Sequence, residues 1–165
     1  MAKIIDTHSH ILPGIDDGAG SWKEALCMLK TAQAQGIRRV IATPHWGGPF
    51  GYTDPVQIRE LCFTLQEKAR RHNISVKIYQ GQEVMYTEEA ADRIANGEIL
   101  TLADSRYVLA EFIRESGIRE FFGSVQRFTQ SGYSPIIAHA ERYESAEKIS
   151  GRLERTTKSR GAYIQ

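Results

Sequence analysis

The sequence has few of the features that mark disulfide-rich, membrane-spanning or nucleic-acid-binding proteins. Only two cysteines occur among 165 residues, and no CxxC spacing links them, so a disulfide framework is not expected. No run approaches the roughly 18 apolar residues that span a bilayer, and a net charge of +1 gives no support to a nucleic-acid partner. The opening MAKIID lacks a signal-peptide pattern. We therefore expect a cytoplasmic protein without membrane insertion, in which Cys27 and Cys62 are reduced, packed thiols.

What the sequence does contain is a regular alternation of strand-like and helix-like segments. β-Branched and apolar residues predict six strands, at 3–10, 38–45, 76–84, 107–112, 134–140 and 161–165. The helices predicted between and after them are 21–35, 54–72, 88–96, 117–131 and 144–158, with Ser21 and Asp54 as N-caps and Gly36 as a C-cap. Such alternation is typical of parallel strands with helical crossovers. The predicted fold class is α/β, in a single domain over 1–165.

Two parallel architectures compete, an open doubly wound sheet and a barrel. In barrels, residues with chemical functions gather at the C-terminal ends of many strands. Five of the predicted strands end in such residues, which are His8, His10, His45, Glu83, Glu111 and His139. This distribution favours a barrel-like sheet with a site in its mouth.

The first strand ends in a pair of histidines. Residues two apart in a strand point to the same side, so Asp6, His8 and His10 are expected on one face. Two imidazoles at this spacing can clamp one metal ion, and an ordinary pair of surface or core histidines is the alternative. Asp6 either orients a ligand histidine or caps the strand.

Two further candidates follow the ends of the first and second strands. Asp16 and Asp17 stand before Gly18 in the loop that leaves the histidine pair, where adjacent aspartates often bond to their own backbone instead. His45 follows Pro44, which ends the strand ladder and would aim the next side chain into the mouth of the sheet. A solvated loop histidine is the alternative for His45.

Carboxylates end the third and fourth strands. Glu83 follows Gly81, and Glu111 is embedded in the apolar LAEF segment. A buried ionised carboxylate costs several kcal/mol unless it is paired or binds a cation. A metal ion is the simpler partner, and a salt bridge with Arg142 or a helix lysine is the alternative.

Histidine and carboxylate ligands without thiolates are typical of manganese, iron or zinc in a reactive site, more than of structural zinc. Carboxylates can also bridge ions, which suggests a cluster. A multinuclear site binds phosphate oxygens and supplies hydroxide for in-line attack. Arg142, three residues after His139, has the planar guanidinium that binds phosphate bidentately. The residues therefore predict phosphate ester hydrolysis without a covalent enzyme intermediate.

Five segments, in this order and at these intervals, resemble one known superfamily: DTHSHILPGIDDGA, IATPH, GQEV, YVLAEF and IIAHAER. It is the polymerase and histidinol phosphatase (PHP) superfamily, and the likeness is greatest to the bacterial CpsB/CapC-type protein-tyrosine phosphatases. The resemblance runs through the whole chain. It implies a distorted (β/α)7 barrel, of which this chain supplies about six parallel strands, with a manganese-supported site of two to three ions. The implied partner is a phosphotyrosine protein, typically a bacterial tyrosine kinase that controls capsule or exopolysaccharide export.

The resemblance also implies a role for each candidate residue. His8 and His10 fall on one ion, with Glu83 as a bridge to a second. Glu111 and His139 complete the ligands of the second ion.

The third ion receives Asp17 and His45, and Arg142 matches the arginine that holds the substrate phosphate. Trp46 stands where relatives often carry a second histidine, and Ala140 where they often carry proline.

The resemblance further leads us to expect a C-terminally incomplete domain. Family members run to about 250 residues, as barrels of this type do, and a later strand adds an aspartate and a histidine to the first and third ions. An open barrel has exposed edges that favour pairing with another chain, so a homo-oligomer is compatible with the sequence. Two alternatives to a tyrosine phosphatase stay open, a phosphatase of a small ester such as histidinol phosphate, and an inactive metal-binding or kinase-docking remnant.

Overall fold

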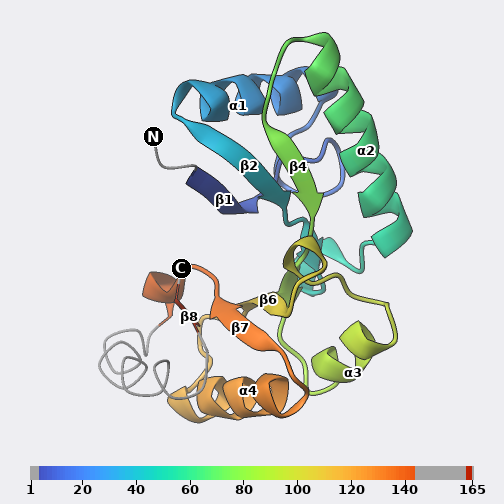
Figure 1. Cartoon of the computed structure of the whole chain (residues 1–165). Helices are drawn as coiled ribbons and strands as arrows, with labels where there is room; N and C mark the ends of the chain where they lie inside the picture. The colour runs from blue at the N-terminus through green and yellow to red at the C-terminus, as the bar shows by residue number, and fades with distance from the viewer. Residues whose placement is uncertain (1–3, 144–162, 165) are drawn as a thin grey trace.

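The computed structural model describes residues 4–143 and 163–164 (Figure 1). Its strands are β1 (Ile4–Ser9), β2 (Ile37–Ala42), β3 (His45–Trp46), β4 (Lys77–Gln80), β5 (Glu83–Met85), β6 (Tyr107–Glu111), β7 (Ser134–Ile137) and β8 (Tyr163–Ile164). Its α-helices are α1 (Trp22–Ala34), α2 (Pro55–Arg71), α3 (Ala90–Ala95) and α4 (Ile118–Gln130), and its 3-10 helices are η1 (Gly48–Phe50), η2 (Leu102–Asp104) and η3 (Ala140–Arg142). All six predicted strand segments contain strands. The predicted helix 144–158 lies outside the described residues.

Two of the predicted strands are each interrupted once. The segment 38–45 divides into β2 and β3 around Pro44, which has no N–H to donate to a ladder. The segment 76–84 divides into β4 and β5 at Gly81, where a Cβ atom would lie 3.0 Å from side-chain atoms of both Ile41 and Leu102. Each interruption moves the chain from one sheet to the next, so β3 continues β2 and β5 continues β4.

Within residues 4–143 and 163–164, every pair of named strands is parallel, and the strands of each sheet are neighbours in the order in which the chain forms them. One sheet has the order β1-β2-β4, and the other has the order β3-β5-β6-β7-β8. An order that never reverses is typical of a barrel wall, whereas a doubly wound sheet reverses at its switch point. The α/β class with parallel strands is therefore confirmed. Closure of the wall into a barrel stays a prediction.

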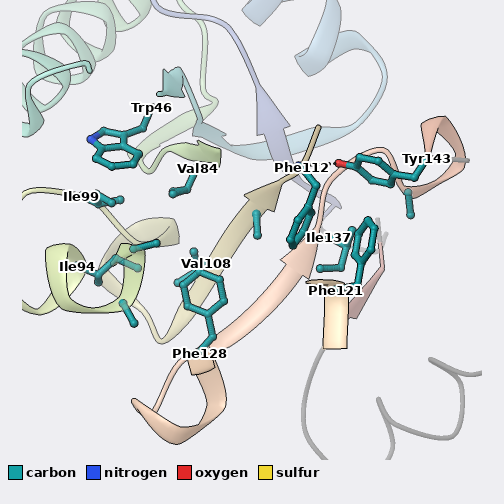
Figure 2. Packing of buried hydrophobic residues seen from close by; sticks show 14 residues of the cluster. Trp46, Val84, Ile94, Ile99, Val108, Phe112, Phe121, Phe128, Ile137 and Tyr143 are labelled. Atoms are coloured by element: carbon teal, nitrogen blue, oxygen red, sulfur yellow. Dashed lines mark hydrogen bonds between the residues drawn. The ribbon is translucent and has the colours of Figure 1, made fainter. Parts of the chain in front are cut away.

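Helices cover each sheet and bury two main apolar cores. Figure 1 shows α1 and α2 against β2 and β4, and α3 and α4 beside β6 and β7. The first core is built around Leu29, Ile58 and Leu65, and the second around Val108, Phe121 and Phe128. In the second core, shown in Figure 2, Phe112 lies against Phe121 with ring centroids 4.3 Å apart, near the strand ends that carry polar residues.

Local signals in the sequence account for the helix ends. The side chains of Ser21 and Asp54 accept hydrogen bonds from backbone N–H groups in the first turns of α1 and α2, as predicted for N-caps. Gln35 is the C-cap of α1, and Gly36 follows it with a φ of 87°, which is the left-handed conformation that glycine adopts at little cost.

The two cysteines are free, as expected, but only one of them is packed. Cys62 lies on the buried face of α2, whereas Cys27 is exposed. The buried residues of α1 are Ala25 and Leu29. Cys27 is two positions from each of them, so it lies off the buried face of the helix. The packing predicted for Cys27 was therefore wrong.

Among the described residues, the structure has no helix with the length and apolar character needed to cross a membrane.

Candidate metal centre

The histidine pair at the end of β1 points into one cavity, as predicted. The Nε2 atoms of His8 and His10 are 3.3 Å apart, and each lies 3.1 Å from Oε2 of Glu83. Asp6 does not share this face. Its carboxylate accepts the backbone N–H of His8, and it lines a different cavity beside α1, because the β1–β2 register shifts between Asp6 and Ser9. This local contact agrees with the strand-capping alternative for Asp6.

The loop after β1 folds back against the strand that it leaves. The carbonyl of His10 accepts the N–H of Ala19 at 3.0 Å, and a Cβ atom at position 18 would lie only 2.0 Å from that carbonyl oxygen. Only glycine fits there, so Gly18 permits the close return of the chain. The return places the two adjacent aspartates beside the histidines.

Asp16 is the residue whose role the sequence did not reveal. Its fully buried carboxylate lies 2.7 Å from Nδ1 of His10 and accepts backbone N–H groups from Gly18 at 3.0 Å and from His45 at 3.2 Å. It therefore joins the ends of β1 and β3 and orients the His10 ring, as a carboxylate behind a metal-ligating histidine does. The only signal was its position next to Asp17, which alone was predicted as a ligand.

His45 lies in the same cluster, so it is not a solvated loop residue. Its Nε2 is 3.5 Å from Oδ1 of Asp17, and its Nδ1 is 3.4 Å from Glu83 and 3.3 Å from Glu111. The Thr53 hydroxyl donates to its backbone carbonyl at 2.8 Å. The short strand β3, which pairs with β5 at His45 and Glu83, fixes this position.

Glu83 is the centre of the arrangement. Its side chain is 1% exposed, and its two oxygens lie between 2.9 and 3.4 Å from ring nitrogens of four histidines, which are His8, His10, His45 and His139. Within the described part of the chain, the ion-pair partners of Glu83 and Glu111 are histidines rather than Arg142 or a lysine. The salt-bridge alternative for these carboxylates is therefore wrong there.

His139 is held in an unusual backbone conformation at the end of β7. Its φ of 32° and ψ of 52° are left-handed, which is uncommon for a residue with a side chain and is found at functional sites. Its Nε2 lies 2.9 Å from Glu83 and 3.2 Å from Glu111. The buried Tyr143 hydroxyl accepts the N–H of Phe112 at 3.1 Å and donates to the carbonyl of Ala138 at 3.2 Å, so it ties together the strand ends that carry these ligands.

These pairings shift the pKa values of the groups strongly. Burial alone would raise the pKa of Glu83, but hydrogen bonds with His10, His139 and His8 hold it well below its usual range. Burial opposes protonation of His10, yet its hydrogen bonds with Asp16 and Glu83 raise its pKa to about 10. Hydrogen bonds with Glu111 and Glu83 raise the pKa of His139 to about 9.

Glu111 and His45 follow the same pattern. Burial would raise the pKa of Glu111, but hydrogen bonds with His139 and His45 lower it to about 2. Burial opposes protonation of His45, whereas its hydrogen bond with Glu111 and the charge of Glu83 raise its pKa. The pocket therefore holds negative carboxylates that require positive charge beside them.

The donor atoms fit a divalent cation. Three groups of side chains each offer ligand atoms within 4.8 Å of one another, and they are His8–His10–Glu83, His10–Asp17–His45 and His45–Glu83–Glu111. When Nδ1 of His10 carries a proton and donates it to Asp16, the lone pair of its Nε2 faces Glu83 and the ring of His8. Lone pairs that converge in this way need a proton or a cation between them. The set therefore suits a polynuclear site with nitrogen and oxygen ligands.

Arg142 stands at the edge of this centre. It lines the same cavity of about 640 Å³ as the histidines and carboxylates. Its side chain is 65% exposed, and its Nε lies 4.0 Å from Glu141, so the guanidinium is free to meet an anion in the cavity. The cavity thus combines the ligand atoms with the guanidinium of Arg142.

The fold and the site together define an α/β protein of parallel strands with a candidate polynuclear metal centre at the strand ends. The chain belongs to the capsular polysaccharide synthesis family CpsB/CapC, whose family model matches residues 4–165. The resemblance found in the sequence motifs is thereby confirmed.

Individual relatives agree with this assignment. The chain is 35% identical over 147 residues to the tyrosine-protein phosphatase YwqE of Bacillus subtilis, covering 84% of this chain and 55% of that protein. It is 33% identical over 162 residues to the tyrosine-protein phosphatase CpsB of Streptococcus pneumoniae, covering 98% of this chain and 66% of that protein. A solved structure, from work on these two proteins as unique metal-dependent tyrosine phosphatases, superposes with a TM-score of 0.89 at 33% identity, covering 98% of this chain and 65% of the other. The chain thus spans between about half and two thirds of these relatives.

Proposed function

We propose that this chain carries the metal-binding residues of a phosphatase that hydrolyses phosphotyrosine on proteins. The observation that carries the proposal is the convergence of four histidine rings on the buried carboxylate of Glu83. Such a set has no structural need in a small α/β domain, because an apolar core is as stable as a buried ionic cluster, or more so. The family relationship supports the same function, since YwqE and CpsB are tyrosine-protein phosphatases.

The proposed ligands divide among two to three Mn²⁺ ions, with Fe or Zn as alternatives. His8 and His10 would hold one ion, and Glu83 would be a ligand shared with another. Glu111 and His139 would complete the second set, since Nε2 of His139 lies beside both Glu83 and Glu111, although His139 is not in the three ligand groups described above.

Asp17 and His45 would serve a third ion. Bound ions at this centre would supply a hydroxide and neutralise phosphate charge. Arg142 binds the phosphate of the substrate through its guanidinium, and Asp16 keeps the ring of His10 in the orientation that ligation requires.

The proposed substrate is a phosphotyrosine protein, for which a bacterial tyrosine kinase in capsule or exopolysaccharide synthesis is the favoured candidate. The description of the family as one of capsular polysaccharide synthesis supports this choice. The single domain over 1–165 and the cytoplasmic location stay predictions of the sequence.

The test is manganese-dependent release of phosphate from a phosphotyrosine peptide by the natural gene product that carries this chain. We expect His139→Ala to abolish release, because it removes a proposed ligand of the second ion, one that also contacts both Glu83 and Glu111. Arg142→Ala should reduce kcat/KM by about tenfold or more, the size of one charge-assisted hydrogen bond, and Arg142→Lys should restore part of it. Arg38→Ala, an exposed arginine on β2, is the matched control.

Two results would redirect the proposal. Full activity after metal removal would overturn it. Hydrolysis of histidinol phosphate, with no release from the phosphotyrosine peptide, would favour the small-ester alternative.

A further inference from the structure

The cavity above the candidate metal centre is polar except at two places on its rim. Among the described residues that line it, Phe50 and Met28 are the large apolar ones, and the others are histidines, acidic residues, Arg142 and small residues. Phe50 comes from η1 and Met28 from α1, so the two side chains reach the cavity from different elements. Each is 40% exposed, so both side chains are accessible to a ligand that enters the cavity.

A tight loop holds Phe50 in this position. Gly47, Gly48 and Gly51 have φ values of 89°, 63° and 75°, which other residues adopt only with strain. The loop is closed by a hydrogen bond from the N–H of Gly47 to the carbonyl of Gly51 at 2.6 Å. Phe50 is therefore presented to the cavity by a defined turn.

The ring of Phe50 stacks on the ring of His45. Their centroids are 4.3 Å apart and their planes differ by 7°. Because His45 also meets Asp17, Glu83 and Glu111, the stack places an aromatic surface directly beside the ligand cluster. Phe50 lines the same cavity as the ligand cluster, so its ring borders the space that a phosphate-bearing group would occupy.

We propose that Phe50, with Met28, forms an aromatic subsite that selects aryl phosphates over alkyl phosphates. This rests on the proposed phosphatase function, and it identifies what distinguishes phosphotyrosine from a small ester at this site. A phosphate held at the cluster and at Arg142 leaves its organic group against the rim. A phenyl ring there gains an aromatic pair with Phe50 and a sulfur–aromatic contact with Met28, whereas a short alkyl chain gains neither.

The test uses binding of non-hydrolysable phosphonates, measured by isothermal titration calorimetry on the manganese-loaded 165-residue chain. The probes are benzylphosphonate, propylphosphonate and 2-aminoethylphosphonate. We expect Phe50→Ala to weaken the binding of benzylphosphonate by about threefold to tenfold, which is the effect of losing one aromatic pair. The affinity for propylphosphonate should change by about twofold or less. Phe50→Tyr should keep the preference and Phe50→Leu should lose most of it.

Phe63→Ala is the matched control, because Phe63 is 70% exposed on α2 and does not line this cavity. Metal content is measured on each sample. If Phe50→Ala weakened the binding of the alkyl and aryl probes equally, the proposal would be overturned, because Phe50 would then act through His45. Tighter binding of 2-aminoethylphosphonate than of benzylphosphonate, or no binding of benzylphosphonate by the unaltered chain, would overturn it as well.

The subsite and the proposed function can fail separately. Selective binding of benzylphosphonate by a protein that releases no phosphate from phosphotyrosine would leave the subsite standing and remove the function. Phosphotyrosine hydrolysis with an aryl preference that does not change in Phe50→Ala would leave the function standing and remove the subsite.

Discussion

Oδ2 of Asp16 lies 2.7 Å from Nδ1 of His10, and the same carboxylate accepts the backbone N–H of His45. One buried side chain thus fixes two proposed ligands that come from different strands. Because Nδ1 is engaged, the Nε2 atom of His10 is the one that faces Glu83. The geometry of the cluster therefore depends on a residue that is absent from the three groups of ligand atoms.

We expect Asp16→Asn to lower metal affinity by about 10- to 100-fold, as the loss of a carboxylate behind a ligand histidine does. The amide keeps the size of the side chain but not its charge, so folding should be retained. Metal titration of the purified variant measures the change. Asp54→Asn is the control, because asparagine caps a helix as well as aspartate does. An unchanged affinity in Asp16→Asn would show that Asp16 serves the loop alone.

Metal occupancy gives a second prediction. Any two of the three ligand groups share one residue, and the group with Asp17 includes a carboxylate that is 57% exposed. Exposed charges are screened by salt, so this group should hold its ion least well. We expect at most two tightly held ions per 165-residue chain, with low phosphatase turnover.

Elemental analysis by mass spectrometry after dialysis measures the number of ions, with activity assayed on the same sample. Asp17→Asn should leave the number unchanged, whereas Glu83→Gln should lower it. Three retained ions with normal turnover would contradict the expected order of affinity.

The stability of the metal-free chain should depend on pH. The pKa values of His10 and His139 are raised from 6.5 to about 10 and about 9. Groups with raised pKa values stabilise the folded state fully below their ordinary pKa, and this contribution is lost as the pH rises through the folded values. Tm of the metal-free chain should therefore fall between pH 6.5 and pH 10, by about 3 °C or more.

Calorimetry with a chelator present measures this dependence, and His139→Gln should show a smaller decline over the same range. The lowered pKa of Glu111, about 2, adds a loss of stability only in acid, below its ordinary pKa of 4.5. Metal binding should strengthen as the pH rises, because the ion displaces protons from histidine. A Tm that rises toward pH 10 without metal would contradict the paired arrangement.

The two thiols should differ in reactivity. Cys27 is exposed, whereas burial raises the pKa of Cys62 to about 12. The thiolate is the reactive form, so iodoacetamide should label one site per folded chain. Mass spectrometry should find the label on Cys27, and Cys27→Ser should leave the folded chain unlabelled. Both cysteines should react in concentrated guanidinium chloride. Rapid labelling of Cys62 in the folded chain would contradict its burial.

The alternation of strands and helices, and several helix ends, could be predicted from sequence because they depend on local chemistry. Ser21 and Asp54 cap helices through contacts within one turn. The ends of parallel strands meet at one edge, so His45 and Glu83 could be placed near each other once both were recognised as strand ends. The candidate ligands followed from the same reasoning and from the family resemblance.

Other features were decided only by the tertiary structure. The position of Asp16 depends on a loop that returns to its own strand, and periodicity does not describe irregular backbone. The division at Gly81 depends on the close approach of Ile41 and Leu102, and the stack of Phe50 on His45 depends on a turn built from three left-handed glycines. Sequence patterns report what each segment prefers in isolation. Which side chains meet is set by packing between segments far apart in the chain, where burial and hydrogen bonding outweigh local preference.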